Sequence, residues 1–174
     1  MKTMMILYGF FSFALTGGSN FYNQRLQTID GNTINTSIYQ GKRVVIVVIN
    51  ATTPNVTQLQ YLDSIENSNA LIKVIAIPTE DFGAAANIPT LNNLQKTTGF
   101  TVTTPLKVKK NGSQAQSPLF SWLTNSVQNT HFDNDADGEG QLFIVSEKGT
   151  LFAVLAKNAP LDVVGKVINQ PFSE

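Results

Sequence analysis

Hydroxyl side chains and a proline lie at the turn where a buried strand is expected to lead into a helix. The β-branched run 44–49 is followed by Thr52, Thr53 and Pro54. A threonine hydroxyl can act as a nucleophile in acyl transfer only with a base beside it. The single histidine, His131, is far away along the chain in a polar loop. The simpler interpretation is a helix start, with a hydroxyl near the N-cap and proline in the first turn.

A second group with chemical potential is the D-x-D-x-D-G pattern formed by Asp133, Asp135, Asp137 and Gly138. Alternating carboxylates with glycine in the sixth place let a loop place oxygen atoms around Ca²⁺. The EF-hand version needs a bidentate glutamate in the twelfth place, which here is Ile144. Asp, Asn and Gly clusters are also common in solvated turns. Calcium binding is therefore a hypothesis, and we assign no residue as a metal ligand and expect no cofactor.

Thiol chemistry is not available to this chain, because its 174 residues contain no cysteine. The 12 basic and 12 acidic residues cancel and are scattered, so no basic patch is present to neutralise phosphates. Nucleic-acid binding is not expected. This composition is compatible with a monomer that binds an unidentified protein partner.

The N-terminal segment has the three-part pattern of a secretory signal peptide. Lys2 supplies a positive end, residues 4–15 are almost wholly apolar, and small residues follow at 16–19. We expect residues 1–18 to be a bacterial-type signal peptide and residues 19–174 to form one exported domain, periplasmic or extracellular. Residues 15–18 resemble a lipoprotein cleavage box in which Gly18 replaces the acceptor cysteine, so no stable membrane anchor is expected after cleavage.

The rest of the chain alternates strand and helix patterns. Apolar residues with β-branched enrichment predict strands at 44–49, 71–77, 141–145 and 151–155, and Pro78 is expected to stop the second. Apolar spacing and capping signals predict helices at 56–68 and 89–98 and helices that begin at Pro118 and Pro160. In the last helix, an inward face is expected at Val163, Val164, Val167 and Ile168. Asp30-Gly31 predicts an early hairpin. The order predicts an α/β three-layer sandwich with a mixed central sheet flanked by helices.

These segments, in this order, resemble the glutathione peroxidase family, which has a thioredoxin-like fold. The resemblance runs from Phe21 to about Ile168. It is carried by Phe21-Tyr22, Ile29-Asp30-Gly31, Tyr39-Gln40-Gly41-Lys42, Ile77-Pro78-Thr79-Glu80-Asp81-Phe82-Gly83, Thr104-Pro105-Leu106, Asn111-Gly112, Pro118-Leu119-Phe120-Ser121-Trp122-Leu123 and Phe143-Ile144-Val145-Ser146-Glu147-Lys148-Gly149.

The resemblance implies that every catalytic position of the family is substituted here. The family's nucleophilic cysteine or selenocysteine falls at Pro54, or at Thr53 if the alignment shifts by one residue. Its glutamine falls at Asp81, and its tryptophan and asparagine fall at Gly138 and Glu139. The second cysteine of thioredoxin-dependent members falls at Thr79. Peroxide reduction needs a thiolate that becomes a sulfenic acid, and neither threonine nor proline can replace it.

We therefore expect an exported glutathione peroxidase-like protein that is catalytically inactive and acts by binding or scaffolding. One alternative is a peroxidase that acts in the response to oxidative stress, as descent from the family would suggest. A second alternative is a small calcium-stabilised extracellular binding module.

Overall fold

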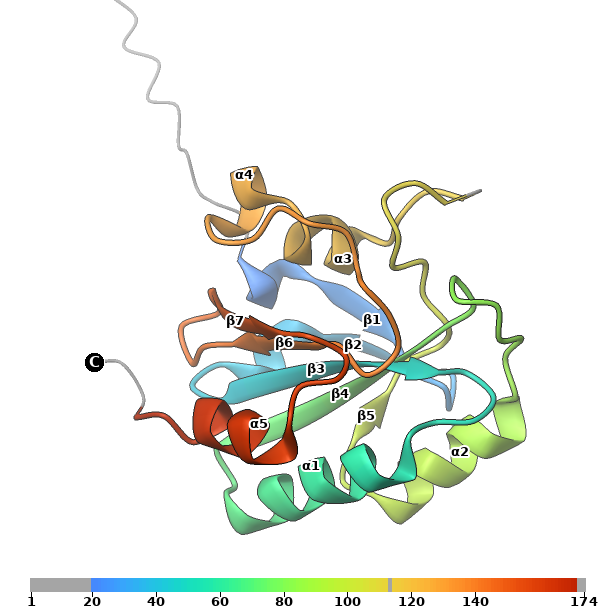
Figure 1. The fold of residues 1–174 in the computed structure, drawn as a ribbon, viewed down its shortest axis with the longest axis horizontal. Coiled ribbons are helices and arrows are strands. Elements are labelled where there is room, and N and C mark those ends of the chain that lie inside the picture. Colours follow the sequence, from blue (N-terminus) through green and yellow to red (C-terminus); the bar gives the residue numbers. More distant parts are fainter. Residues whose placement is uncertain (1–19, 113, 172–174) are drawn as a thin grey trace, which may run out of the picture.

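The computed structural model describes residues 20–112 and 114–171, which build a five-stranded sheet with helices on both faces (Figure 1). The strand order is β5-β4-β3-β6-β7. β3 (Arg43–Asn50) lies in the middle, parallel to β4 (Ile72–Thr79), which is parallel to β5 (Thr101–Val102). β6 (Leu142–Val145) is antiparallel to both β3 and β7 (Leu151–Leu155). The predicted three-layer arrangement with a mixed sheet is confirmed. The predicted signal peptide lies outside the described residues.

The central strand β3 separates two hydrophobic cores. Successive side chains of a strand point to opposite faces, so an uninterrupted apolar run suits a strand that is covered on both sides. One core contains Val44, Ile46 and Val48, and the other contains Val45, Val47 and Ile49. All six side chains are buried.

Three helices cover one face of the sheet: α1 (Val56–Ser68), α2 (Ile88–Thr97) and α5 (Leu161–Ile168). In Figure 1 they lie below the sheet. Leu59, Leu62, Leu91, Val164 and Ile168 are their buried contacts with the core. None of the helices in the described part of the chain is long and apolar enough to cross a lipid bilayer.

The opposite face is covered by α3 (Pro118–Leu123), α4 (Ser126–Asn129) and the N-terminal segment. That segment comprises the 3₁₀ helices η1 (Phe21–Asn23) and η2 (Thr36–Tyr39), with the predicted hairpin of β1 (Arg25–Gln27) and β2 (Thr33–Asn35) between them. Aromatic rings fill this layer: Phe120 meets Phe143 edge-on at 5.6 Å between centroids, and Phe21 lies 6.2 Å from Trp122. Edge-to-face pairs of this kind stabilise a core beyond their buried area.

Two expectations about individual residues are wrong. Pro78 does not stop β4, which continues to Thr79 with Pro78 opposite Ile49. β5 pairs only with Ile75 and Ala76, so the missing amide of Pro78 leaves no ladder position empty on that side. Val163 of α5 does not face the core and is 38% exposed, whereas Val164 and Ile168 are buried.

Candidate functional site

The candidate site lies where β3 and β4 end side by side. Asn50, the last residue of β3, is opposite Thr79, the last residue of β4. The carboxyl ends of parallel strands open toward the same edge of a sheet, which is the usual position of a ligand site in open α/β sheets. The turn after β3 carries Thr53 and Pro54, the two positions predicted for the family's nucleophile.

Asn50 organises this corner through both ends of its amide. Its Oδ1 accepts hydrogen bonds from the backbone amides of Thr52 and Thr53, at 2.8 and 2.7 Å. Its Nδ2 donates to both carboxylate oxygens of Glu139, at 2.8 and 2.9 Å. The structure therefore brings the turn at Thr53 together with Glu139, the position predicted for the family's asparagine.

The hydroxyl groups of the corner have no histidine base. The Thr52 hydroxyl donates to the carbonyl of Ala85, and Thr53 is exposed. His131 lines a hollow of about 240 Å³ next to β7. That hollow shares no lining residue with a separate cavity of about 180 Å³ that Thr53 lines, here called the Thr53 cavity. The arrangement needed for acyl transfer by threonine is not formed.

Asp81, the position predicted for the family's glutamine, holds the segment 107–109. Its Oδ2 accepts the amides of Val108 and Lys109 at 2.6 and 3.0 Å, and its Oδ1 lies 3.5 Å from the Lys107 ammonium. Burial alone would raise the pKa of Asp81, but the amide hydrogen bonds from Lys109 and Val108 and the charge of Lys107 together lower it. Asp81 does not line the Thr53 cavity.

Gly138 and Glu139, the predicted tryptophan and asparagine positions, belong to a loop that is held close to β3 and α1. A Cβ atom on Gly138 would lie 2.7 Å from Cδ of Lys157, so a larger side chain needs that lysine to move. Gly140 donates its amide to the Val48 carbonyl at 2.7 Å and accepts from Nε2 of Gln58 at 2.8 Å. Glu139 is thereby placed directly beside the end of β3.

The Thr53 cavity lies between this loop and the start of α1. Its lining comprises Val48, Ile49, Asn50, Thr53, Asn55, Gln58, Glu139 and Gly140. Asn50 and Gln58 had not been predicted from the sequence as site residues. The sequence does contain a signal for Gln58, because a polar residue on the same helical face as the apolar Leu62 and Ile65 is expected to be buried and hydrogen-bonded. For Asn50 the only signal is its position at the end of a strand.

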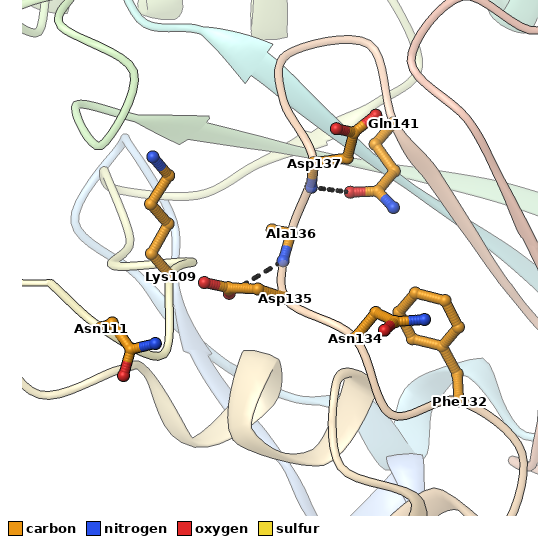
Figure 2. Close-up of a pocket in the computed structure, with 8 residues that line it drawn as sticks. All are labelled: Lys109, Asn111, Phe132, Asn134, Asp135, Ala136, Asp137 and Gln141. Carbon is orange, nitrogen blue, oxygen red and sulfur yellow. Dashed lines mark hydrogen bonds between the residues drawn. The ribbon is translucent and has the colours of Figure 1, made fainter.

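The Asp-rich loop does not gather its carboxylates, and Figure 2 shows those of Asp135 and Asp137 on separate parts of the loop. Asp133 pairs with the Lys110 ammonium at 3.0 Å, and Asp135 accepts the amides of Lys110 and Ala136 at 2.9 and 2.8 Å. Asp137 lies 3.6 Å from the Lys157 ammonium. The hydrogen bond from Lys110 and then its charge lower the pKa of Asp133. Within residues 20–112 and 114–171, no three acidic or histidine side chains are grouped as metal ligands. This geometry gives the calcium hypothesis no support.

Comparison with known proteins identifies the fold. No protein-family model and no curated protein matches the chain. The structure is similar to that of Trgpx in apo form, with a TM-score of 0.67 and 20% identity over 89% of this chain and 99% of that one. It is also similar to T. cruzi GPX1, with a TM-score of 0.67 and 15% identity over 86% and 94% of the two chains. A secreted Mycobacterium tuberculosis disulfide oxidoreductase homologous to E. coli DsbE gives a TM-score of 0.50 and 14% identity, over 84% and 95%.

These structural neighbours identify the fold of the chain. The chain has a thioredoxin-like fold of the kind found in glutathione peroxidases, as the sequence motifs predicted. The similarity extends over almost the whole length of both glutathione peroxidase chains.

Proposed function

We propose that this protein is an exported, glutathione peroxidase-like binding protein that does not reduce peroxides. The observation that carries the proposal is the corner after β3. There, Thr53 and Pro54 occupy the turn, and Asn50 holds the turn amides and Glu139 in one hydrogen-bonded arrangement. This arrangement positions polar groups around a cavity and contains no group that can be oxidised reversibly.

The chemical argument concerns the atom that would accept oxygen from a hydroperoxide. A thiol has a pKa of about 8.5, so modest help from its surroundings produces the thiolate that attacks the O–O bond. The alcohol of threonine ionises far less readily and has no counterpart of the sulfenic acid step. The three methionines, at positions 1, 4 and 5, all fall in the segment predicted to be a signal peptide.

Export is supported by the pattern of the N-terminal segment, which is basic, then apolar, then small. One structural neighbour with a thioredoxin-like fold is described as secreted. Cell fractionation tests this part of the proposal: we expect the protein in the periplasm or the medium, shortened by about 18 residues. Intact protein in the cytoplasm would contradict it.

The test of inactivity is a hydroperoxide turnover assay on the purified protein. We expect no consumption of hydrogen peroxide or cumene hydroperoxide above buffer, with either glutathione or thioredoxin as reductant. A rate that scales with protein concentration and is lost on heat denaturation would overturn the proposal.

Cysteine variants give the assay a positive control and test the position of the former nucleophile. Thr53→Cys and Pro54→Cys place a thiol at the two candidate positions in the turn, and Ser64→Cys places one at an exposed position of α1, the helix that follows the turn. We expect sulfenic acid labelling by dimedone after peroxide treatment to be stronger at position 53 or 54 than at position 64. Equal labelling at all three positions would show that this corner does not favour thiol oxidation.

A further inference from the structure

The cavity beside Glu139 is lined by several hydrogen-bond acceptors, one of them a carboxylate. The Glu139 carboxylate is half-buried and receives a hydrogen bond from Asn50 Nδ2. Gln58 is 6% exposed and uses its Nε2 to donate to the Gly140 carbonyl, which leaves its Oε1 as the remaining polar atom of that amide. The exposed Thr53 hydroxyl completes this set of oxygen atoms.

Three backbone amides of this corner are already used within the protein. The amides of Thr52 and Thr53 bond to Asn50 Oδ1, and the amide of Gln58 bonds to the Asn55 side chain at 3.2 Å. A helix N-terminus ordinarily favours an anion through such amides. Here Asn55 occupies the Gln58 amide of the first turn, and Glu139, which lines the same cavity, carries a full negative charge that opposes an anion.

Glu139 has no cationic partner among the residues that the structure describes, since none of their ion pairs includes it. Lys157 packs against Gly138, but its ammonium group lies 3.3 Å from the carbonyl and 3.6 Å from the carboxylate of Asp137. A partly desolvated carboxylate is stabilised by a nearby cation. The cavity therefore has a charge that an external ligand can neutralise.

We propose that this cavity binds the ammonium group of a primary amine, either a small alkylammonium ion or a lysine side chain. The proposal rests on the proposed binding function and names its ligand class. An ammonium group has three N–H donors, which match the oxygens of Glu139, Gln58 and Thr53. Ca²⁺ fits less well, because it takes six to eight oxygen ligands from protein groups and waters, and this cavity offers one carboxylate. Its volume of about 180 Å³ is well above the roughly 10–15 Å³ that one water requires, so it has room for an ammonium group with a short alkyl stem.

The test is a titration followed by amide chemical shifts in low-salt buffer, because salt screens a partly exposed charge pair. The ligands are n-butylammonium chloride, the neutral n-butanol, and the blocked amino acids N-acetyl-lysine methylamide and N-acetyl-norleucine methylamide. We expect shifts at residues 50–58 and 138–140 with the two amines and none there with the two neutral compounds. Tighter binding of the lysine derivative would identify a protein side chain as the ligand, and tighter binding of butylammonium would identify a small amine.

Variants separate this site from a general charge effect. Glu139→Gln keeps an acceptor for Asn50 and removes the charge, and we expect affinity for the amines to fall at least tenfold. Thr53→Leu fills the cavity and leaves Glu139 in place, so it should also abolish the shifts. Asp162→Asn removes one negative charge from the exposed side of α5 and should leave amine binding unchanged.

Unchanged affinity in Glu139→Gln and Thr53→Leu, or equal shifts with butanol, would overturn the amine site. That outcome is distinguishable from failure of the proposed function, which is decided by hydroperoxide turnover of the unmodified protein.

Discussion

Replacement of Asp81 by asparagine tests whether this carboxylate, at the position predicted for the glutamine of glutathione peroxidases, stabilises the fold. In the native protein the carboxylate accepts two backbone amides, from Val108 and Lys109, and lies near the Lys107 ammonium. These contacts attach the irregular segment 107–109 to the end of β4. Both amides bond to Oδ2, so in Asp81→Asn the carbonyl oxygen can take that position and accept both without a full charge. The new NH₂ group then takes the position of Oδ1 and faces the Lys107 ammonium.

The magnitude follows from the contacts that are weakened or lost. A hydrogen bond to a charged group contributes about 1.5–3 kcal/mol to stability and a neutral one about 0.5–1.5 kcal/mol, and two bonds change from the first kind to the second. The Lys107 side chain is 30% exposed, so its ion pair adds at most about 1 kcal/mol. We expect the free energy of unfolding to fall by about 2 kcal/mol. For a protein of this size, that corresponds to a decrease in Tm of about 4–8 °C.

The assay is urea unfolding of both proteins from pH 7 to pH 3, with Asp162→Asn as control. The pKa of Asp81 in the folded state is lowered from 3.8, so its stabilising effect is complete above the unfolded-state pKa. That effect is lost as the pH falls through the folded-state pKa. The difference between native protein and Asp81→Asn should be largest at pH 7 and shrink below about pH 4.

The control carboxylate, Asp162, is 66% exposed and forms an i,i+4 pair with Lys166, so its replacement should cost no more than about 0.5 kcal/mol. The reasoning on Asp81 would be refuted by equal stability of Asp81→Asn and the native protein at pH 7. A difference that stays constant down to pH 3 would refute its electrostatic part.

Two further variants test contacts that hold the layers together. Glu66 is buried and accepts hydrogen bonds from the Lys73 ammonium at 2.9 Å and the Val74 amide at 3.0 Å. Glu66→Gln should lower the free energy of unfolding by about 2 kcal/mol. An unchanged urea midpoint would contradict this. Gly149 has φ +78°, and a Cβ atom at this position would lie 2.6 Å from the Tyr22 ring. Gly149→Ala should therefore lower Tm by at least about 5 °C. Calorimetry that shows no change in Tm would disprove the packing argument.

The order of strands and helices was largely predictable, because its signals are local. The β-branched run before Asn50 predicted β3, and apolar residues at three-residue spacing predicted α1 with the bounds that the structure shows. The prediction that Pro78 ends β4 was wrong. Proline usually stops a strand because it lacks an amide donor, but β5 is too short to reach Pro78 and needs no such donor there. The prediction that Val163 faces the core was wrong, because an apolar residue next to the buried face of a helix can still point toward solvent.

The candidate site was predictable only in part. The turn at Thr53 and Pro54 and the loop at Glu139 were both identified from the motifs, and the structure places them together through Asn50. Asp81 was identified as a family position, but its attachment to residues 107–109 had no sequence signal. The pairing of Asp133 and Asp137 with lysines was likewise invisible in the D-x-D-x-D-G pattern.

The sequence alone determined the chemical inventory: no cysteine, balanced charge, and motifs in an order that indicates a thioredoxin-like fold. Only the tertiary structure decided how those residues are used. Asn50 and Glu139 are 89 positions apart and meet because β6 pairs with β3 and the loop before β6 is drawn against the end of that strand. Contacts of this kind depend on strand register and loop packing, which are set by the whole core, so neither residue carries a local signal of its partner.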